Sequence, residues 1–162
     1  MHLGRRLAVL LKVLAVFLVM GPPVGALTFF VGVGINGVIE TGSIADAALY
    51  TMFGLIYGVP LSYLIGTTPA LISGSILGAT AALHHVPGLP FASAVGFVVG
   101  LGMALYALGG SIEPPSAETA SGYVFSLFLF AACLVSTVVC WIVARSLLCL
   151  SAKASPTRRQ DI

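Results

Sequence analysis

Charged residues are scarce in this sequence of 162 residues, where they make up only 7% of the chain. A soluble globular domain has about 25% charged residues, and a chain with so few cannot cover a water-facing surface. The sequence therefore predicts an exterior that faces the lipid bilayer. The formal net charge is only +2 and the basic residues lie near the two ends, so nucleic-acid binding has no support.

The middle of the chain has no charged side chain, because no Asp, Glu, Lys or Arg occurs between Asp46 and Glu113. Proton pumps and ion-coupled carriers usually place an ionisable group within the membrane, so this gap weighs against both. The sequence also lacks a nucleophile elbow and a P-loop. A G-x-G-x-x-G match at residues 32–37 follows an apolar span rather than a strand, and we interpret it as chance. The chain is therefore predicted not to be an enzyme and to bind no cofactor.

Cysteine and histidine are too few and too poorly spaced for a metal site. Cys133, Cys140 and Cys149 all fall in the last apolar segment, so we interpret them as packing residues rather than a disulfide framework. His84 and His85 are adjacent, and neighbours on a helix point about 100° apart. One metal ion would fit both poorly, so an interfacial or helix-end role is favoured and no metal ligand is predicted.

Four segments are long and apolar enough to cross a bilayer, which takes about 20 residues of helix. A fifth segment, residues 69–83, would reach only about 22 Å. The predicted fold is an all-α integral membrane protein, a compact bundle of five hydrophobic helices with four full spans and a short half-helix over 69–83. Five full spans are the alternative. The four long segments are residues 7–35, which Gly21, Pro22 and Pro23 interrupt, and residues 47–65, 91–110 and 121–150.

The charges that are present predict an orientation. All seven Lys and Arg lie near the ends of the chain, whereas the linkers at residues 36–46 and 111–122 contain acidic charges alone. By the positive-inside rule both termini are cytoplasmic and both linkers external, which requires an even number of spans. Residues 1–150 are expected to form a single transmembrane domain, and residues 151–162 a mobile polar cytoplasmic tail. The expected location is a bacterial inner membrane.

Small residues recur at every fourth position along the middle segments. Residues four apart share one face of a helix, and small side chains let helix backbones approach closely in lipid. We therefore expect tight helix contacts, mainly among the three middle segments. The residues predicted to pack helices together are Gly54, Gly58, Gly66, Gly74, Gly78, Gly96 and Gly100.

Two prolines and several hydroxyl side chains interrupt residues 57–74. Proline removes a backbone donor and disturbs the preceding turn, and interrupted helices at membrane depth form the binding sites of many transporters. The other interpretation is a capping turn, with Thr68 as N-cap and Pro69 opening a short helix, while Pro60 kinks its own span. The candidates for a solute site or structural break are Tyr57, Pro60, Ser62, Thr67, Thr68, Pro69 and Ser73.

Two classes of function remain open at this point. The first is a non-enzymatic subunit or scaffold of the inner membrane, which packs against a membrane-protein partner or a second copy of itself, and the small-residue pattern favours it. The alternative is a small permease or channel for an uncharged or weakly polar solute. The interrupted segments favour this second class, with Tyr50, Tyr57 and Tyr63 lining the path.

Overall fold

The computed structural model contains four α-helices, and the residues that it describes, 2–83, 86–109 and 117–153, include no strand. The all-α prediction is confirmed. Each helix holds a stretch long and apolar enough to cross a membrane, so the chain fits a polytopic membrane protein. His84, His85 and most of the predicted tail, residues 154–162, lie outside the described part. The helices are α1 (His2–Thr41), α2 (Ile44–Leu83), α3 (Leu89–Ala107) and α4 (Ala117–Lys153).

The predicted fifth helix is wrong, because residues 69–83 form the second half of α2. This helix has 40 residues and continues through the capping turn predicted at Thr68 and Pro69. Thr68 is therefore not an N-cap, and Pro69 lies in the helix interior instead of opening a helix. Pro22 and Pro23 likewise lie inside α1. Within a membrane bundle a proline can stay in a helix, because neighbouring helices and hydroxyl side chains satisfy the backbone groups that it releases.

The connection between α1 and α2 is much shorter than the predicted linker at residues 36–46. Only Gly42 and Ser43 separate the two helices. Gly42 has a φ of 68°, and its N–H donates to the carbonyl of Val38 at 2.9 Å. A glycine in this left-handed conformation is a common way to end a helix. The Thr41 hydroxyl also donates to the carbonyl of Gly37 at 2.8 Å, and the two long helices thereby form one hairpin.

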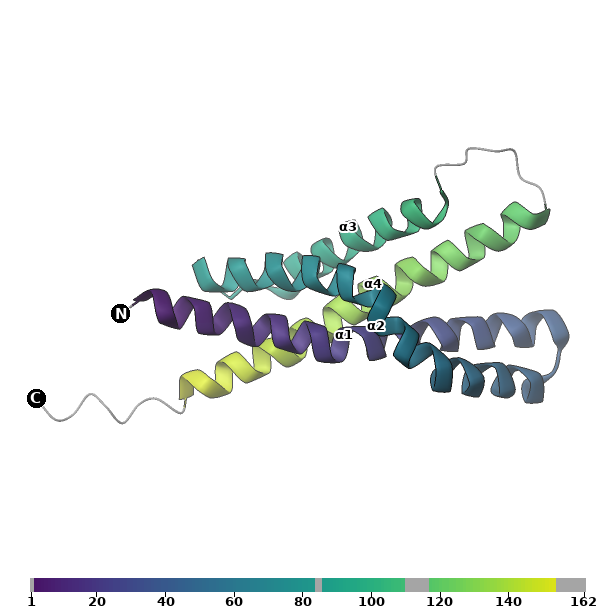
Figure 1. The fold of residues 1–162 in the computed structure, drawn as a ribbon, viewed down its shortest axis with the longest axis horizontal. Coiled ribbons are helices and arrows are strands. Elements are labelled where there is room, and N and C mark those ends of the chain that lie inside the picture. The colour runs from purple at the N-terminus through teal and green to yellow at the C-terminus, as the bar shows by residue number, and fades with distance from the viewer. Residues whose placement is uncertain (1, 84–85, 110–116, 154–162) are drawn as a thin grey trace, which may run out of the picture.

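The molecule consists of two helical hairpins that cross (Figure 1). One is built from α1 and α2, and the other from α3 and α4. The start of α1 and the end of α4 lie at the same end of the molecule, and the α1–α2 connection lies at the opposite end. The ribbon of α2 bends midway along its length, and this helix contains Pro60 and Pro69. Proline is the usual cause of such a bend.

The hydrophobic core lies in the half of the molecule where α1 begins and α4 ends. All four helices contribute to it, which makes this half a four-helix bundle. Large apolar side chains outside the core remain exposed along every helix, and this is the pattern of a protein whose solvent is lipid. The buried cluster comprises Val13, Phe17, Leu77, Ala92, Val95, Cys140, Trp141 and Ala144.

Candidate functional site

The proline-containing parts of α1 and α2 face each other near the middle of the molecule. A methyl group placed at Gly66 would lie 3.5 Å from Cα of Pro22. One placed at Gly21 would lie 3.3 Å from Cβ of Ala70 and 3.7 Å from Oγ of Ser136 on α4. We call this region the proline crossing, defined as residues 21–23 of α1, residues 66–70 of α2 and Ser136.

Two side chains from other helices bind carbonyl groups of α1 at or next to the proline crossing. Pro23 has no N–H and cannot donate to the carbonyl of Val19, four residues earlier. The Tyr63 hydroxyl donates to that carbonyl at 3.0 Å. The Ser136 hydroxyl donates to the carbonyl of Gly21 at 2.8 Å. Because lipid offers no hydrogen bonds to a helix backbone, the Tyr63 hydroxyl supplies the donor that Pro23 lacks. The Ser136 hydroxyl adds a link between α4 and α1 beside the prolines.

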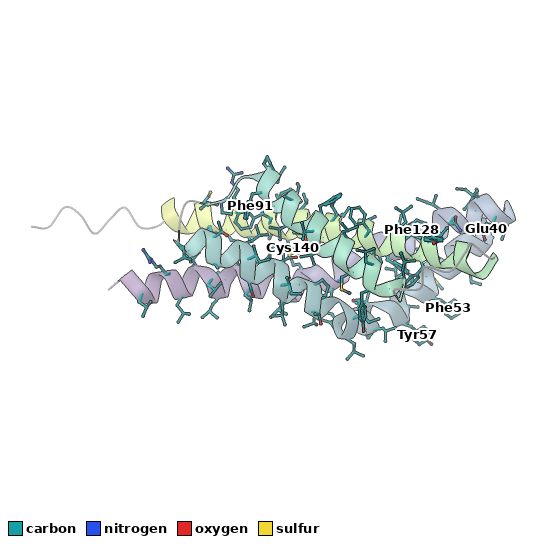
Figure 2. The ribbon with its side chains drawn as sticks, turned by 90° about the horizontal axis from the view of Figure 1, so that it is seen from above. Glu40, Phe53, Tyr57, Phe91, Phe128 and Cys140 are labelled. Carbon is teal, nitrogen blue, oxygen red and sulfur yellow. The ribbon has the colours of Figure 1, made fainter. Side chains whose placement is uncertain are left out.

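The predicted candidates for a solute site do not converge on one place. Tyr57 is 69% exposed and stacks on Phe53, with ring centroids 6.3 Å apart, and Figure 2 shows both at the edge of the bundle. The Ser62 hydroxyl donates to the carbonyl of Val59 at 2.7 Å. The Thr67 hydroxyl donates to the carbonyl of Tyr63. Both hydroxyl groups therefore bind their own helix.

The remaining candidates are divided between the outside and the inside of the bundle. Pro60 and Thr68 are exposed, whereas Pro69 is buried. Ser73 is 1% exposed, and its hydroxyl has no hydrogen-bond partner among the described residues. The part of the chain that the structure describes contains no group of three or more His, Cys, Asp or Glu that could hold a metal ion.

The predicted packing glycines each lie against another helix, but their partners differ from the prediction. The middle segments were expected to pack mainly on one another, and this is wrong. Two of them are halves of α2, and the glycines of α2 face α1 while those of α3 face α4. The contacts are Gly54 and Gly58 with Phe30, Gly66 with Pro22, Gly74 with Phe17, Gly78 with Leu10, Gly96 with Thr137, and Gly100 with Phe130.

The glycines of α2 contact α1 over a long stretch that includes the bend of α2. A row of period four drifts by about 40° per step around a helix of 3.6 residues per turn. A straight neighbour would soon lose contact with it. Nevertheless α1 contacts α2 from Gly54 to Gly78, a stretch that contains Pro60 and Pro69. The bend midway along α2 therefore falls within the stretch over which its glycines contact α1.

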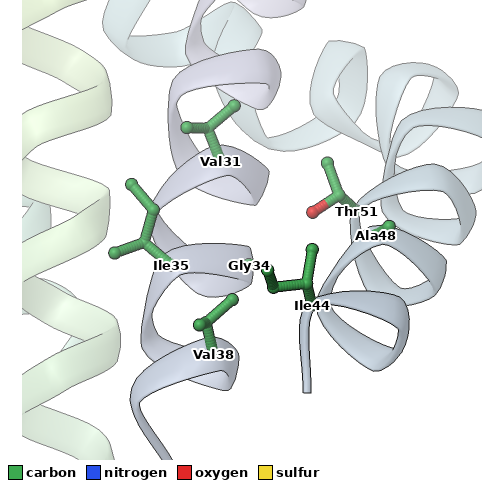
Figure 3. A pocket seen from close by; sticks show the side chains of 7 residues that line it. All are labelled: Val31, Gly34, Ile35, Val38, Ile44, Ala48 and Thr51. Atoms are coloured by element: carbon green, nitrogen blue, oxygen red, sulfur yellow. The ribbon is translucent and has the colours of Figure 1, made fainter. Parts of the chain in front are cut away.

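A cleft of about 260 Å³ lies between α1 and α2, away from the proline crossing and close to the connection of the hairpin (Figure 3). Its walls are apolar except for one hydroxyl group. Sequence reasoning missed this cleft, because its residues come from the end of one helix and the start of the next and form no motif. The residues that line it are Val31, Gly34, Ile35, Val38, Ile44, Ala48 and Thr51.

Tyr63→Phe is expected to destabilise the protein by about 0.5–1.5 kcal/mol, the usual contribution of one hydrogen bond. In a Pro23→Ala background the restored N–H can donate to the carbonyl of Val19, so the same substitution should cost less. Chemical unfolding in detergent measures both differences. Tyr57→Phe, at a side chain 69% exposed, is the control and should change stability by less than about 0.5 kcal/mol. An equal cost of Tyr63→Phe in both backgrounds would show that the tyrosine does not replace the missing donor.

Comparison with known proteins gives no relative for this chain. No protein-family model, no curated protein and no solved structure matches it. The function must therefore be inferred from the geometry of the chain itself.

Proposed function

We propose that the protein is a non-enzymatic membrane subunit or scaffold that binds a partner membrane protein through the α1–α2 hairpin. The observation that carries this proposal is the apolar cleft between α1 and α2. Its lining residue Ile44 is 77% exposed, and Ile39, which follows the lining residue Val38, is 75% exposed. A cleft open at the side of a membrane bundle suits an apolar helix of a neighbour, since packing of shapes drives helix association in lipid.

The proline crossing supports a structural role as well. Its Ser136 hydroxyl and the neighbouring Tyr63 hydroxyl both donate to backbone carbonyls of α1. These two hydrogen bonds link α2 and α4 to α1. The second candidate is a permease for an uncharged or weakly polar solute. Prolines lie inside both α1 and α2, and interrupted helices form the binding sites of many transporters.

The proposed location is a bacterial inner membrane, with both ends of the chain in the cytoplasm. The positions of the charges support this orientation. Arg6 and Lys12 lie near the start of α1 and Arg145 near the end of α4, at one end of the molecule. Glu40 lies at the opposite end (Figure 2). Lys and Arg are retained on the cytoplasmic side of membrane proteins.

Site-specific photo-crosslinking in native membranes tests the subunit proposal. A photoreactive residue at Ala48, which lines the cleft, should give one dominant adduct that copurifies in a fixed ratio. The same residue at Tyr106 on α3, 83% exposed, is the control and should give none. Absence of an adduct at Ala48, together with solute flux in liposomes that contain the pure protein, would favour the permease instead.

A further inference from the structure

Burial is distributed unevenly along the α1–α2 hairpin. Where α2 joins the four-helix half of the molecule, Ser73 and Leu77 are almost completely buried. Over residues 44–68, by contrast, Gly58 is the one buried residue among those whose side chains the structure describes. We call residues 24–65, which lead from the proline crossing through the connection and back, the distal arm. The distal arm therefore has little core of its own.

A small group of aromatic rings holds the distal arm against α4. Phe29 of α1 lies edge-on to Phe125 and Phe128 of α4, with ring centroids 5.2 and 6.4 Å apart. A methyl group at Gly32 would lie 2.7 Å from Cδ1 of Phe128. Toward the α1–α2 connection the two hairpins diverge (Figure 1). We call Phe29, Phe125 and Phe128 the aromatic latch, and each ring pair in it is a weak contact.

The prolines form a pivot between the distal arm and the four-helix half. Pro22 and Pro23 lie inside α1 and Pro69 inside α2. The two helices are interrupted at the same level, because a methyl group at Gly66 would lie 3.5 Å from Cα of Pro22. A proline removes one backbone hydrogen bond and is the usual site of a helix bend. Helices α1 and α2 can therefore bend together here, whereas α4 contains no proline.

The hydrogen bonds at the crossing are compatible with such a bend. The Tyr63 hydroxyl donates to the carbonyl of Val19, and the Ser136 hydroxyl donates to the carbonyl of Gly21. Both bonds lie close to the pivot. Rotation displaces groups near its axis much less than groups far from it, so these bonds can persist while the far end of the arm moves.

We propose that the distal arm pivots about the proline crossing, and that the aromatic latch holds it against α4 in the arrangement of Figure 1. Release of the latch moves the connection at Gly42 away from the end of α3. A thinly packed element that opens from a better packed core about a few hinge residues is a common form of conformational change. The apolar cleft lies within the distal arm and moves with it, whatever the cleft binds.

Distances between paired nitroxide labels, measured by double electron–electron resonance in lipid nanodiscs, test the pivot. In a cysteine-free variant, Ile39→Cys and Tyr106→Cys place labels on α1 and α3 near the connection end, at side chains 75% and 83% exposed. Leu7→Cys and Phe91→Cys place a second pair on the same helices at the opposite end. The first pair should give a broad distribution with a longer-distance component, and the second pair a narrow one. Equally narrow distributions for both pairs would contradict the pivot.

Two substitutions should shift the distribution of the first pair in opposite directions. Phe29→Ala removes the latch and should raise the ratio of long to short distances about five- to tenfold. Pro22→Ala/Pro23→Ala restores two backbone donors in α1 and should reduce the longer-distance component. Phe97→Ala is the matched control, because Phe97 also makes an edge contact, at 5.3 Å with Phe130, but within the α3–α4 hairpin. It should leave the first pair unchanged.

The control and the second pair of labels separate a pivot from general loosening. An effect of Phe97→Ala as large as that of Phe29→Ala would overturn the proposal, as would equal broadening at both label pairs. An unchanged distribution of the first pair in both the Phe29→Ala and the Pro22→Ala/Pro23→Ala variants would overturn it as well. Circular dichroism confirms that each variant is folded.

Discussion

Gly58→Leu is expected to lower the thermal stability of the bundle in detergent strongly. A methyl group at Gly58 would overlap Cε2 and Cζ of the Phe30 ring, and one at Gly54 would overlap the same ring from its other edge. The ring therefore rests in a notch formed by two glycines one turn apart. Overpacking usually costs about 1–3 kcal/mol, and a leucine here must also move α1 away from α2. Against a total stability of about 5–15 kcal/mol this is a large loss, and thermal unfolding followed by circular dichroism measures it.

The obstacle to a side chain at Gly58 is itself a side chain, so it can be removed. Gly58→Ala should be destabilising alone and much less so in combination with Phe30→Ala, which gives a positive coupling in a double-mutant cycle. Gly102→Leu is the matched control, because no atom of another helix lies within 4 Å of a methyl group there. Equal melting temperatures for Gly58→Leu and Gly102→Leu would contradict the close approach of α1 and α2.

Gly100→Leu should be as damaging, for a different reason. A methyl group at Gly100 would lie 3.1 Å from the backbone carbonyl oxygen of Phe130 and 3.2 Å from Cδ2 of its ring. The oxygen cannot be moved without shifting α4, so the substitution should separate the two helices of the second hairpin.

Substitution of Phe130 by alanine distinguishes the effect at Gly100 from the effect at Gly58. Gly100→Ala should remain destabilising by about 1 kcal/mol or more when Phe130→Ala is also present, because the carbonyl oxygen stays in place. Unfolding of the single and double variants in the same detergent measures the difference. Full recovery of stability in the double variant would show that the ring, and not the backbone, limits the space.

The helical class and the number of spans follow from length and charge, because only about 20 apolar residues can bridge the membrane. The break at Thr68 and Pro69 was predicted from local rules that these two residues satisfy well. The helix continues there because tertiary packing buries Pro69 and places Ala70 close to Gly21. The local sequence does not contain this information, because the stabilising contacts come from another helix.

The sequence also could not predict which residues of different helices contact each other. The period of the small residues identifies a packing face, but it does not say which helix packs on it. The contact of Tyr63 with Val19 depends on the register between α1 and α2. That register depends on the two-residue connection at Gly42 and Ser43, where the sequence predicts a longer linker over residues 36–46. The predicted linker also covers Val38 and Ile44, which line the apolar cleft, so the cleft could not be predicted either.

Labelling of single cysteines from each side of the membrane is the most direct test of a four-span bundle with both ends on one side. In a cysteine-free variant, Gly4→Cys, Gly42→Cys and Ser151→Cys are treated with a membrane-impermeant thiol reagent, in right-side-out and in inverted vesicles. We expect Gly4→Cys and Ser151→Cys to react only in inverted vesicles and Gly42→Cys only in right-side-out vesicles, because the ends of α1 and α4 share one end of the molecule and the connection lies at the other. Reaction of Gly4→Cys and Ser151→Cys from opposite sides would require an odd number of crossings and would contradict the four-span bundle.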